Sequence, residues 1–178
     1  MSTNHASKTE EPWLPSAAGR WLGFAMAIAL AVVALDGLTK WLVVRELGPN
    51  GTRTQIELLG NFVELRYALN SGVAFGLFSG SSTLAGVLVG IVIVPLIIVL
   101  ALLATRGGLW AIASGLVLGG AAGNLIDRIG DESVTDFISI GRWPSFNIAD
   151  SAITVGALIL IGLSLLEHRS ASHESTTP

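Results

Sequence analysis

The chain has 178 residues, of which 51% are hydrophobic and 13% are charged, about half the charged fraction of an ordinary soluble domain. The 10 basic and 13 acidic residues give a net charge of −3 without a basic cluster of the kind that binds nucleic acid. Cysteine is absent and the three histidines (His5, His168, His173) lie in the polar ends, which excludes disulfides, thiolate sites and a histidine-based metal or nucleophile centre within a membrane.

Charged residues are missing from four stretches that have the length of membrane spans. About 20 apolar residues cross a hydrocarbon core of ~30 Å. The stretches without charge are residues 21–35, 67–105, 107–126 and 151–166. We therefore predict an all-α membrane protein with four transmembrane helices, at about residues 21–42, 84–103, 109–126 and 148–166.

The two ends of the chain are polar. Residues 1–20 and 167–178 are rich in Ser, Thr and Glu without periodicity, and we predict disordered tails. The apolar block after Arg20 has some features of a signal peptide, but it continues into Asp36 and Lys40 without a convincing cleavage site. We interpret it as an uncleaved first span, so that residues 21–166 form a single membrane-embedded domain.

Residues 45–80 form the longest stretch outside the predicted spans. They open with a strong turn signal at residues 48–51. Val63, Leu65, Tyr67 and Leu69 then alternate with other residues in the period-2 pattern of a strand with one apolar face. This pattern predicts a small β-sheet and loop at the membrane surface between the first and second spans. A tight turn is expected at residues 105–108 and a loop at residues 127–147.

The parity of the spans decides which polar residues share a side of the membrane. Four antiparallel spans place both termini and the 105–108 turn on one side, and the ends of the first and third spans on the other. Four Lys and Arg residues fall on the first side and six on the second, which does not select an orientation. The polar residues gathered on the second side are Asp36, Lys40, Asn70, Asn124, Asp127, Arg128, Asp136, Asn147 and Asp150.

Several of these residues have a structural and a functional interpretation. Asp36 and Lys40 are four residues apart and share a helix face, as an interfacial ion pair or as substrate-positioning groups; both interpretations remain open. Gly119 and Gly123 have the small-residue spacing that lets membrane helices approach closely. Asp127, on one face with Asn124 and Arg128, is interpreted as a structural ion-pair partner, with Arg128 as the nearest cation, rather than as a catalyst.

Asp136 and Asp150 are the best candidates for chemistry. Two carboxyl groups held together at a membrane surface do not both ionise cheaply, so one holds a proton. An aspartic hydrolase uses this arrangement, because the ionised group activates water and the protonated group donates to the carbonyl oxygen. The alternative, in which both residues cap helices or face water, stays open on these residues alone.

Five motifs resemble, in order, those of the bacterial lipoprotein signal peptidases, also called signal peptidase II. The resemblance covers about residues 21–166. The motifs are Asp36-Gly37-Leu38-Thr39-Lys40, Asn70-Ser71-Gly72-Val73-Ala74-Phe75, Gly119-Gly120-Ala121-Ala122-Gly123-Asn124-Leu125-Ile126-Asp127-Arg128, Val134-Thr135-Asp136-Phe137 and Phe146-Asn147-Ile148-Ala149-Asp150-Ser151.

The resemblance implies an integral-membrane aspartic endopeptidase of the bacterial inner membrane. Its partners would be membrane lipid and prolipoproteins, cut before a diacylglyceryl-modified cysteine without cofactor or metal. Both termini would be cytoplasmic, with an extracytoplasmic sheet and an active site near the outer leaflet. Asp136 and Asp150 would be catalytic. The residues that would bind substrate or support the site are Asp36, Lys40, Asn70, Gly72, Asn124, Asp127, Arg128 and Asn147.

Three other functions have weaker support. A proton-coupled transporter using Asp36, Asp127 and Asp150 would be expected to show internal repeats and a midplane site, and the sequence shows no repeat. A Ser/Lys dyad would need a neutral Lys40, but Asp36 beside it favours the charged form. A presenilin-like protease is excluded because residues 128–131 lack the first glycine of its motif.

Overall fold

The computed structural model describes residues 16–60, 62–70, 94–131 and 133–174. Three of its helices are long and apolar enough to cross a membrane: α1 (Ala17–Leu47), α3 (Gly108–Asp131) and α4 (Ile148–Glu174). A shorter apolar helix, Val94–Ala104, precedes α3. The predicted fold class, a helical membrane protein with a small sheet, is confirmed. The expected beginning of the second span, residues 84–93, lies outside the described residues.

All three long helices are longer than the sequence predicted, and α3 continues to Asp131, into the interval predicted as a loop. α1 begins at Ala17, because the side chain of Ser16 caps it by accepting a hydrogen bond from the backbone N–H of Gly19 at 3.1 Å. α4 continues to Glu174, and its last twelve residues contain neither Gly nor Pro to end it. Residues 17–20 and 167–174 are therefore helical rather than disordered.

Glycines allow the three long helices to approach one another closely. A Cβ atom at Gly119 would lie 2.7 Å from the backbone oxygen of Ala29 on α1, and one at Gly115 would lie 2.6 Å from that of Ala25. On the other face of α3, a Cβ atom at Gly156 of α4 would lie 2.8 Å from the backbone oxygen of Ala113. The predicted close approach at Gly119 is thus confirmed, and α3 packs between α1 and α4.

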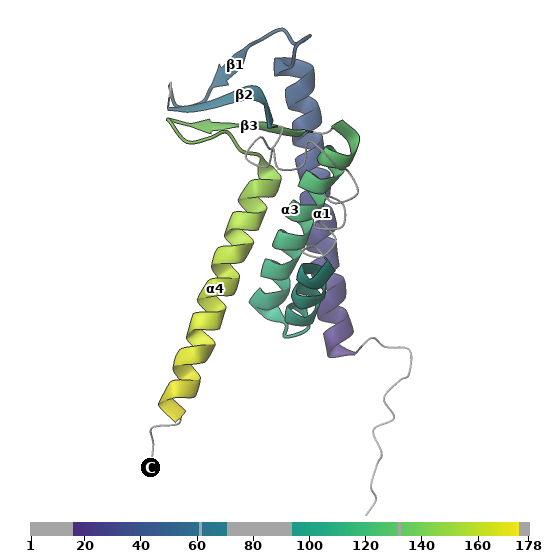
Figure 1. Ribbon diagram of the computed structural model, residues 1–178, viewed down its shortest axis with the longest axis vertical. Coiled ribbons are helices and arrows are strands. Elements are labelled where there is room, and N and C mark those ends of the chain that lie inside the picture. The colour runs from purple at the N-terminus through teal and green to yellow at the C-terminus, as the bar shows by residue number, and fades with distance from the viewer. Residues whose placement is uncertain (1–15, 61, 71–93, 132, 175–178) are drawn as a thin grey trace, which may run out of the picture.

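A three-stranded antiparallel sheet, in the order β1-β2-β3, lies at one end of the helices (Figure 1). β1 (Gln55–Glu57) and β2 (Val63–Asn70) come from the predicted sheet segment. β3 (Val134–Ile140) comes from the interval predicted as a loop. Its pairing with β2, from Val63 opposite Ile140 to Asn70 opposite Val134, joins residues far apart in sequence, which a local pattern does not predict.

The sheet packs on the end of α1 through an apolar cluster. Val43 and Leu47 of α1 contact Phe137 of β3, with Leu65 and Tyr67 of β2 beside them. Leu69 was predicted to share this apolar face, but it is 58% exposed. A register shift between Leu65 and Ala68 inserts an extra residue into β2, and this bulge interrupts the alternation of side chains.

The helices place the polar residues as the span parity predicted. The beginning of α1, the 105–108 turn and the end of α4 lie at one end of the molecule, and the sheet lies across the other (Figure 1). The turn contains Gly107 and Gly108 at positive φ, 87° and 49°, which glycine adopts without strain.

Candidate active site

The segment between β3 and α4 brings two carboxyl groups together. Phe146 pairs with Ile138 of β3, with the Phe146 N–H donating to the Ile138 oxygen at 3.0 Å and the Ile138 N–H to the Phe146 oxygen at 2.8 Å. The next residue, Asn147, is therefore held against the middle of β3. Its amide nitrogen Nδ2 donates to Oδ1 of Asp136 at 2.9 Å.

Asn147 also begins α4, and this fixes Asp150. The Asp150 N–H donates to Oδ1 of Asn147 at 2.8 Å, while the Asn147 N–H donates to Oδ2 of Asp150 at 3.2 Å. This reciprocal pair is a capping box, in which an N-cap side chain and a residue three positions later satisfy each other's backbone groups. Asp150 thus lies in the first turn of α4, where the helix dipole favours negative charge.

The four carboxylate oxygens of the two aspartates each accept a hydrogen bond. Beside the two bonds from Asn147, Nδ2 of Asn124 donates to Oδ1 of Asp150 at 2.7 Å. Nδ2 of Asn70, at the end of β2, donates to Oδ2 of Asp136 at 3.0 Å. Asn147 therefore connects the two predicted catalytic residues, and Asn70 and Asn124 hold the outer oxygens.

Asp136 has a perturbed acidity. Its burial, with only 3% of the residue exposed, raises its pKa above the ordinary value, and the negative charge of Asp150 adds to the effect. The hydrogen bonds from Asn70 and Asn147 and the charge of Lys40 lower the pKa without cancelling the rise. Asp136 consequently keeps its proton to a higher pH than a solvent-exposed aspartic acid.

A buried ion cluster lies beside the two aspartates. Nζ of Lys40 forms ion pairs with Asp36, one of the two interpretations that the sequence left open, and with Asp127 at 2.7 Å. Oδ1 of Asp36 accepts the N–H of Ala149 in the first turn of α4 at 2.9 Å. The carboxylate of Asp36 thereby ties α1 to the helix that carries Asp150, and Gly123 leaves space for it, since a Cβ there would lie 3.0 Å from Oδ2 of Asp36.

The ion cluster also orients the amide of Asn124. Its Oδ1 accepts hydrogen bonds from Nζ of Lys40 at 3.3 Å and from Nδ2 of Asn147 at 3.1 Å. Because both donors lie on the oxygen side, the NH2 group is turned toward Asp150. Lys40 thus contacts the residue that holds Asp150.

The remaining predicted residues have different surroundings. Asp127 pairs with Lys40 instead of Arg128, because its side chain points toward α1 while Arg128 is exposed. Nη1 of Arg128 donates to the backbone oxygen of Asn124 at 3.1 Å, near the end of α3. Gly72 lies outside the described residues.

Some contacts that support the site have no motif in the sequence. Nη2 of Arg66 on β2 donates to Oγ of Ser145 at 3.2 Å, and the hydroxyls of Ser139 and Ser145 lie 2.8 Å apart. These bonds hold the segment that leads into Asn147. An isolated serine in a turn carries no local signal of such a role, because Arg66 is 79 residues away in the sequence and Ser139 contacts Ser145 only when the chain turns back after β3.

The groups gathered at this end are two carboxyls with amide partners and one lysine ammonium paired with two further carboxylates. Within the described ranges, no three His, Asp or Glu side chains are grouped so as to hold a metal ion. The arrangement suits acid–base catalysis in which a buried carboxyl that keeps its proton and a more accessible carboxylate act on the same reacting group.

Known proteins resemble this chain over most of its length. A family model described as Signal peptidase (SPase) II matches residues 28–166. The lipoprotein signal peptidase of Rhodococcus jostii is 42% identical over 150 residues, covering 78% of this chain and 71% of that protein. The lipoprotein signal peptidase of Shouchella clausii is 43% identical over 145 residues, covering 80% and 90%.

A solved structure has the same fold. It is a bacterial membrane enzyme determined by the in meso method at 2.3 Å resolution, with a TM-score of 0.65 and 30% identity, and the match covers 84% of this chain and 91% of that one. The sequence comparisons and the fold comparison thus point to the same family, and this membrane protein belongs to the signal peptidase II family.

Proposed function

We propose that the protein is an aspartic endopeptidase that removes signal peptides from prolipoproteins, cutting before a diacylglyceryl-modified cysteine. Family membership supports a peptidase. The observation that carries the aspartic mechanism is that Asn147 donates a hydrogen bond to both Asp136 and Asp150. Asn70 and Asn124 donate to the other carboxylate oxygen of each aspartate.

In the proposed reaction the two aspartates have opposite protonation states. Ionised Asp150 takes a proton from a water molecule as its oxygen attacks the amide carbonyl carbon, and protonated Asp136 donates to the carbonyl oxygen. The resulting diol collapses as the C–N bond breaks. The amine receives a proton from Asp150, and Asp136 recovers its own from the second hydroxyl. The raised pKa of Asp136 supports its assignment as the protonated partner.

The surroundings suit a substrate that remains in the membrane. The two aspartates lie at the end of the apolar helices, where a peptide bond close to a lipid-bearing cysteine would also lie. An apolar cavity of about 310 Å³ between α1, α3 and helix Val94–Ala104 reaches Leu125, directly after Asn124. A space lined by such side chains accepts hydrocarbon groups and is unsuited to a charged substrate.

The proposed location is the bacterial inner membrane, with both termini in the cytoplasm and the sheet and active site at the outer leaflet. A transporter with Asp36, Asp127 and Asp150 as a proton relay has less support. Asp36 and Asp127 are both ion-paired with Lys40, and this arrangement suits a fixed support better than a proton path.

The proposed reaction is tested with the purified protein in liposomes. The substrate is a peptide with an apolar signal segment followed by diacylglyceryl-cysteine, and the matched control is the same peptide with an unmodified cysteine. We expect mass spectrometry to find one cut, directly before the modified cysteine, and much slower cleavage of the control. Cleavage at another bond, or substrate-dependent proton flux without cleavage, would overturn the proposal.

A further inference from the structure

One end of the sheet exposes an unusual concentration of large apolar side chains. Leu58 is 54% exposed, Leu59 71%, Phe62 63% and Trp143 70%. We call these four residues the sheet tip. Leu58, Leu59 and Phe62 lie in the turn between β1 and β2, and Trp143 lies just after β3.

Backbone pairing makes the sheet tip one surface. Val63 at the start of β2 lies opposite Ile140 at the end of β3. The N–H of Gly141 donates to the backbone oxygen of Phe62 at 2.8 Å, and the Phe62 ring lies 3.4 Å from the position of a Cβ atom on Gly141. The N–H groups of Leu58 and Leu59 both donate to the oxygen of Val63, at 2.9 and 3.3 Å. These hydrogen bonds tie Leu58, Leu59 and Phe62 to the backbone at the ends of β2 and β3.

The two exposed tryptophans of α1 are spaced as the two borders of a membrane are. Trp21 and Trp41, 38% and 55% exposed, are 20 residues apart, which is about 30 Å along a helix and equals the thickness of a hydrocarbon core. Exposed tryptophans are enriched at both membrane interfaces. The guanidinium of Arg45 lies 5.5 Å from the centre of the Trp41 ring, on the side of Trp41 toward the sheet.

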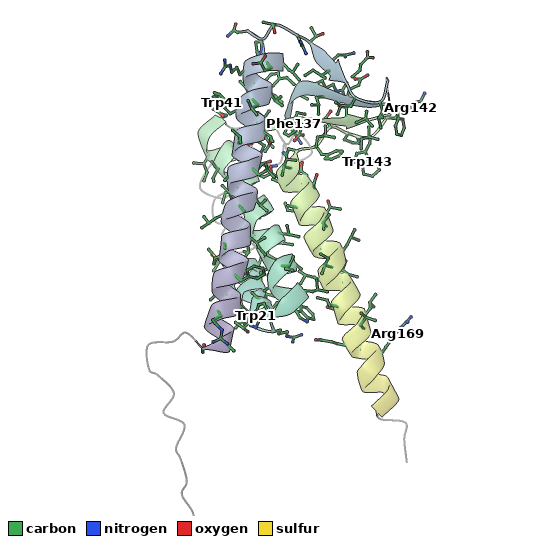
Figure 2. All side chains as sticks on the ribbon, turned by 180° about the vertical axis from the view of Figure 1, so that it is seen from behind. Trp21, Trp41, Phe137, Arg142, Trp143 and Arg169 are labelled. Carbon is green, nitrogen blue, oxygen red and sulfur yellow. The ribbon has the colours of Figure 1, made fainter. Side chains whose placement is uncertain are left out.

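The sheet, with Trp143 at its edge, lies at the same end of the helices as Trp41 (Figure 2). In Figure 2 the sheet extends sideways beyond the helices, and Trp143 projects from it in the direction in which the helices run, below the level of Trp41 in this view. Arg142 lies at the outer edge of the same turn. Apolar and indole groups with a neighbouring cation are the combination that binds the headgroup region of a lipid bilayer.

We propose that the sheet tip inserts into the headgroup region of the membrane that the helices cross, with Arg142 at the lipid phosphates. The occupant of this surface is lipid, because the tip continues the interface that Trp41 marks. Insertion would hold β3, and with it Asp136, at headgroup depth. The consequence for catalysis depends on the proposed peptidase function, whereas the insertion itself does not.

The absence of cysteine from the chain makes a direct test feasible. Leu59→Cys, labelled with a nitroxide in the full chain, is placed in phosphatidylglycerol-containing liposomes and studied by electron paramagnetic resonance with oxygen and a water-soluble nickel chelate as relaxants. Thr52→Cys, exposed in the loop after α1, is the aqueous control. We expect the label at position 59 to be relaxed more by oxygen than by the chelate, and the label at position 52 to show the reverse.

A label at position 59 that is as accessible to the chelate as the control would overturn the proposal. So would spin–spin broadening at position 59, which would assign the surface to a second copy of the chain. Trp143→Cys provides an independent label if Leu59→Cys does not fold.

A second experiment tests the effect of insertion on catalysis. Leu59→Glu is expected to reduce cleavage of a liposome-embedded substrate several-fold and to leave cleavage in detergent unchanged. If Leu59→Glu lost cleavage both in liposomes and in detergent, while the spin label at position 59 was found in the membrane, the proposed effect on catalysis would be wrong and the proposed insertion would stand.

Discussion

Asn147 shows how much of the candidate site depends on one side chain. It is completely buried, and its Oδ1 accepts the N–H of Asp150 while its Nδ2 donates to Asp136 and Asn124. An aspartate at this position would place a third acceptor against the carboxylates, and an alanine would leave several buried groups without partners. The amide is suited to this position because it donates and accepts at once.

The acidity of Asp136 leads to a prediction for the pH profile. A raised pKa means that Asp136 keeps its proton to higher pH than an ordinary carboxyl group. Since the proposed mechanism needs that proton, activity is lost as pH rises through this pKa. The hydrogen bond from Asn70 favours the charged form, so Asn70→Ala raises the pKa further and moves the alkaline limb of kcat/KM to higher pH.

The control for this measurement is Asn50→Ala, in the exposed turn after α1, which should leave the profile unchanged. An alkaline limb that moves to lower pH in Asn70→Ala would contradict the assignment of Asp136 as the proton donor.

Asp127 is expected to contribute to stability. Asp127→Asn removes the charge that pairs with Lys40, while the pair between Lys40 and Asp36 remains. We expect a destabilisation of about 1.5–3 kcal/mol, the range for hydrogen bonds to charged groups, measured as a lower Tm, with cleavage activity retained. Asp131→Asn, at the exposed end of α3, is the matched control. A variant with wild-type Tm and no activity would show instead that Asp127 takes part in catalysis.

At the scale of elements, the sequence predicts the helices far better than the sheet. Absence of charge over about 20 residues is a local property, and it locates α1, α3 and α4 to within a few residues at most ends. β3 was missed because Asp136 and Phe137 are both buried, so the strand lacks a simple alternation. Its partner, β2, is more than 60 residues away.

The helix contacts lead to a prediction about glycine. Gly119→Ala places a Cβ atom 2.7 Å from the Ala29 oxygen and 2.8 Å from Cβ of Val32, so α1 and α3 must move apart. We expect a lower Tm. Gly162→Ala on α4, with nothing within 4 Å of the new Cβ, is the matched control and should be neutral or stabilising by up to about 1 kcal/mol. Equal Tm values for the two variants would contradict the packing account.

For the whole molecule, the order and direction of the helices are predictable from the sequence, but the hydrogen bonds and ion pairs between them are not. Span parity alone placed Asp36, Asn124, Asp136 and Asp150 on one side of the membrane, because antiparallel helices alternate direction. It gave no indication that Asp36 caps α4 through the Ala149 N–H, or that Lys40 pairs with Asp127 from another helix. Such contacts depend on how the helices pack, and packing is not a local property of the sequence.

The proposed orientation is testable in intact bacteria. Thr52 lies at the end of the molecule that carries the sheet, and Glu167 lies toward the other end, late in α4. Each is replaced by cysteine in a separate variant. The reagent is a maleimide that does not cross the inner membrane, applied to cells whose outer envelope has been made permeable. It should label the cysteine of Thr52→Cys directly, and that of Glu167→Cys only after the inner membrane is permeabilised as well. The reverse pattern would place the termini outside and contradict the proposed location.

The central claim is that Asp136 and Asp150 together hydrolyse the peptide bond. The measurement that tests it most directly is cleavage of a diacylglyceryl-cysteine peptide by purified Asp136→Asn and Asp150→Asn, with Asp131→Asn as the matched control. Loss of general acid–base catalysis should reduce the rate by about 10²–10⁴-fold in each dyad variant, while the control cleaves normally. Wild-type cleavage by a folded Asp136→Asn or Asp150→Asn variant would contradict the account.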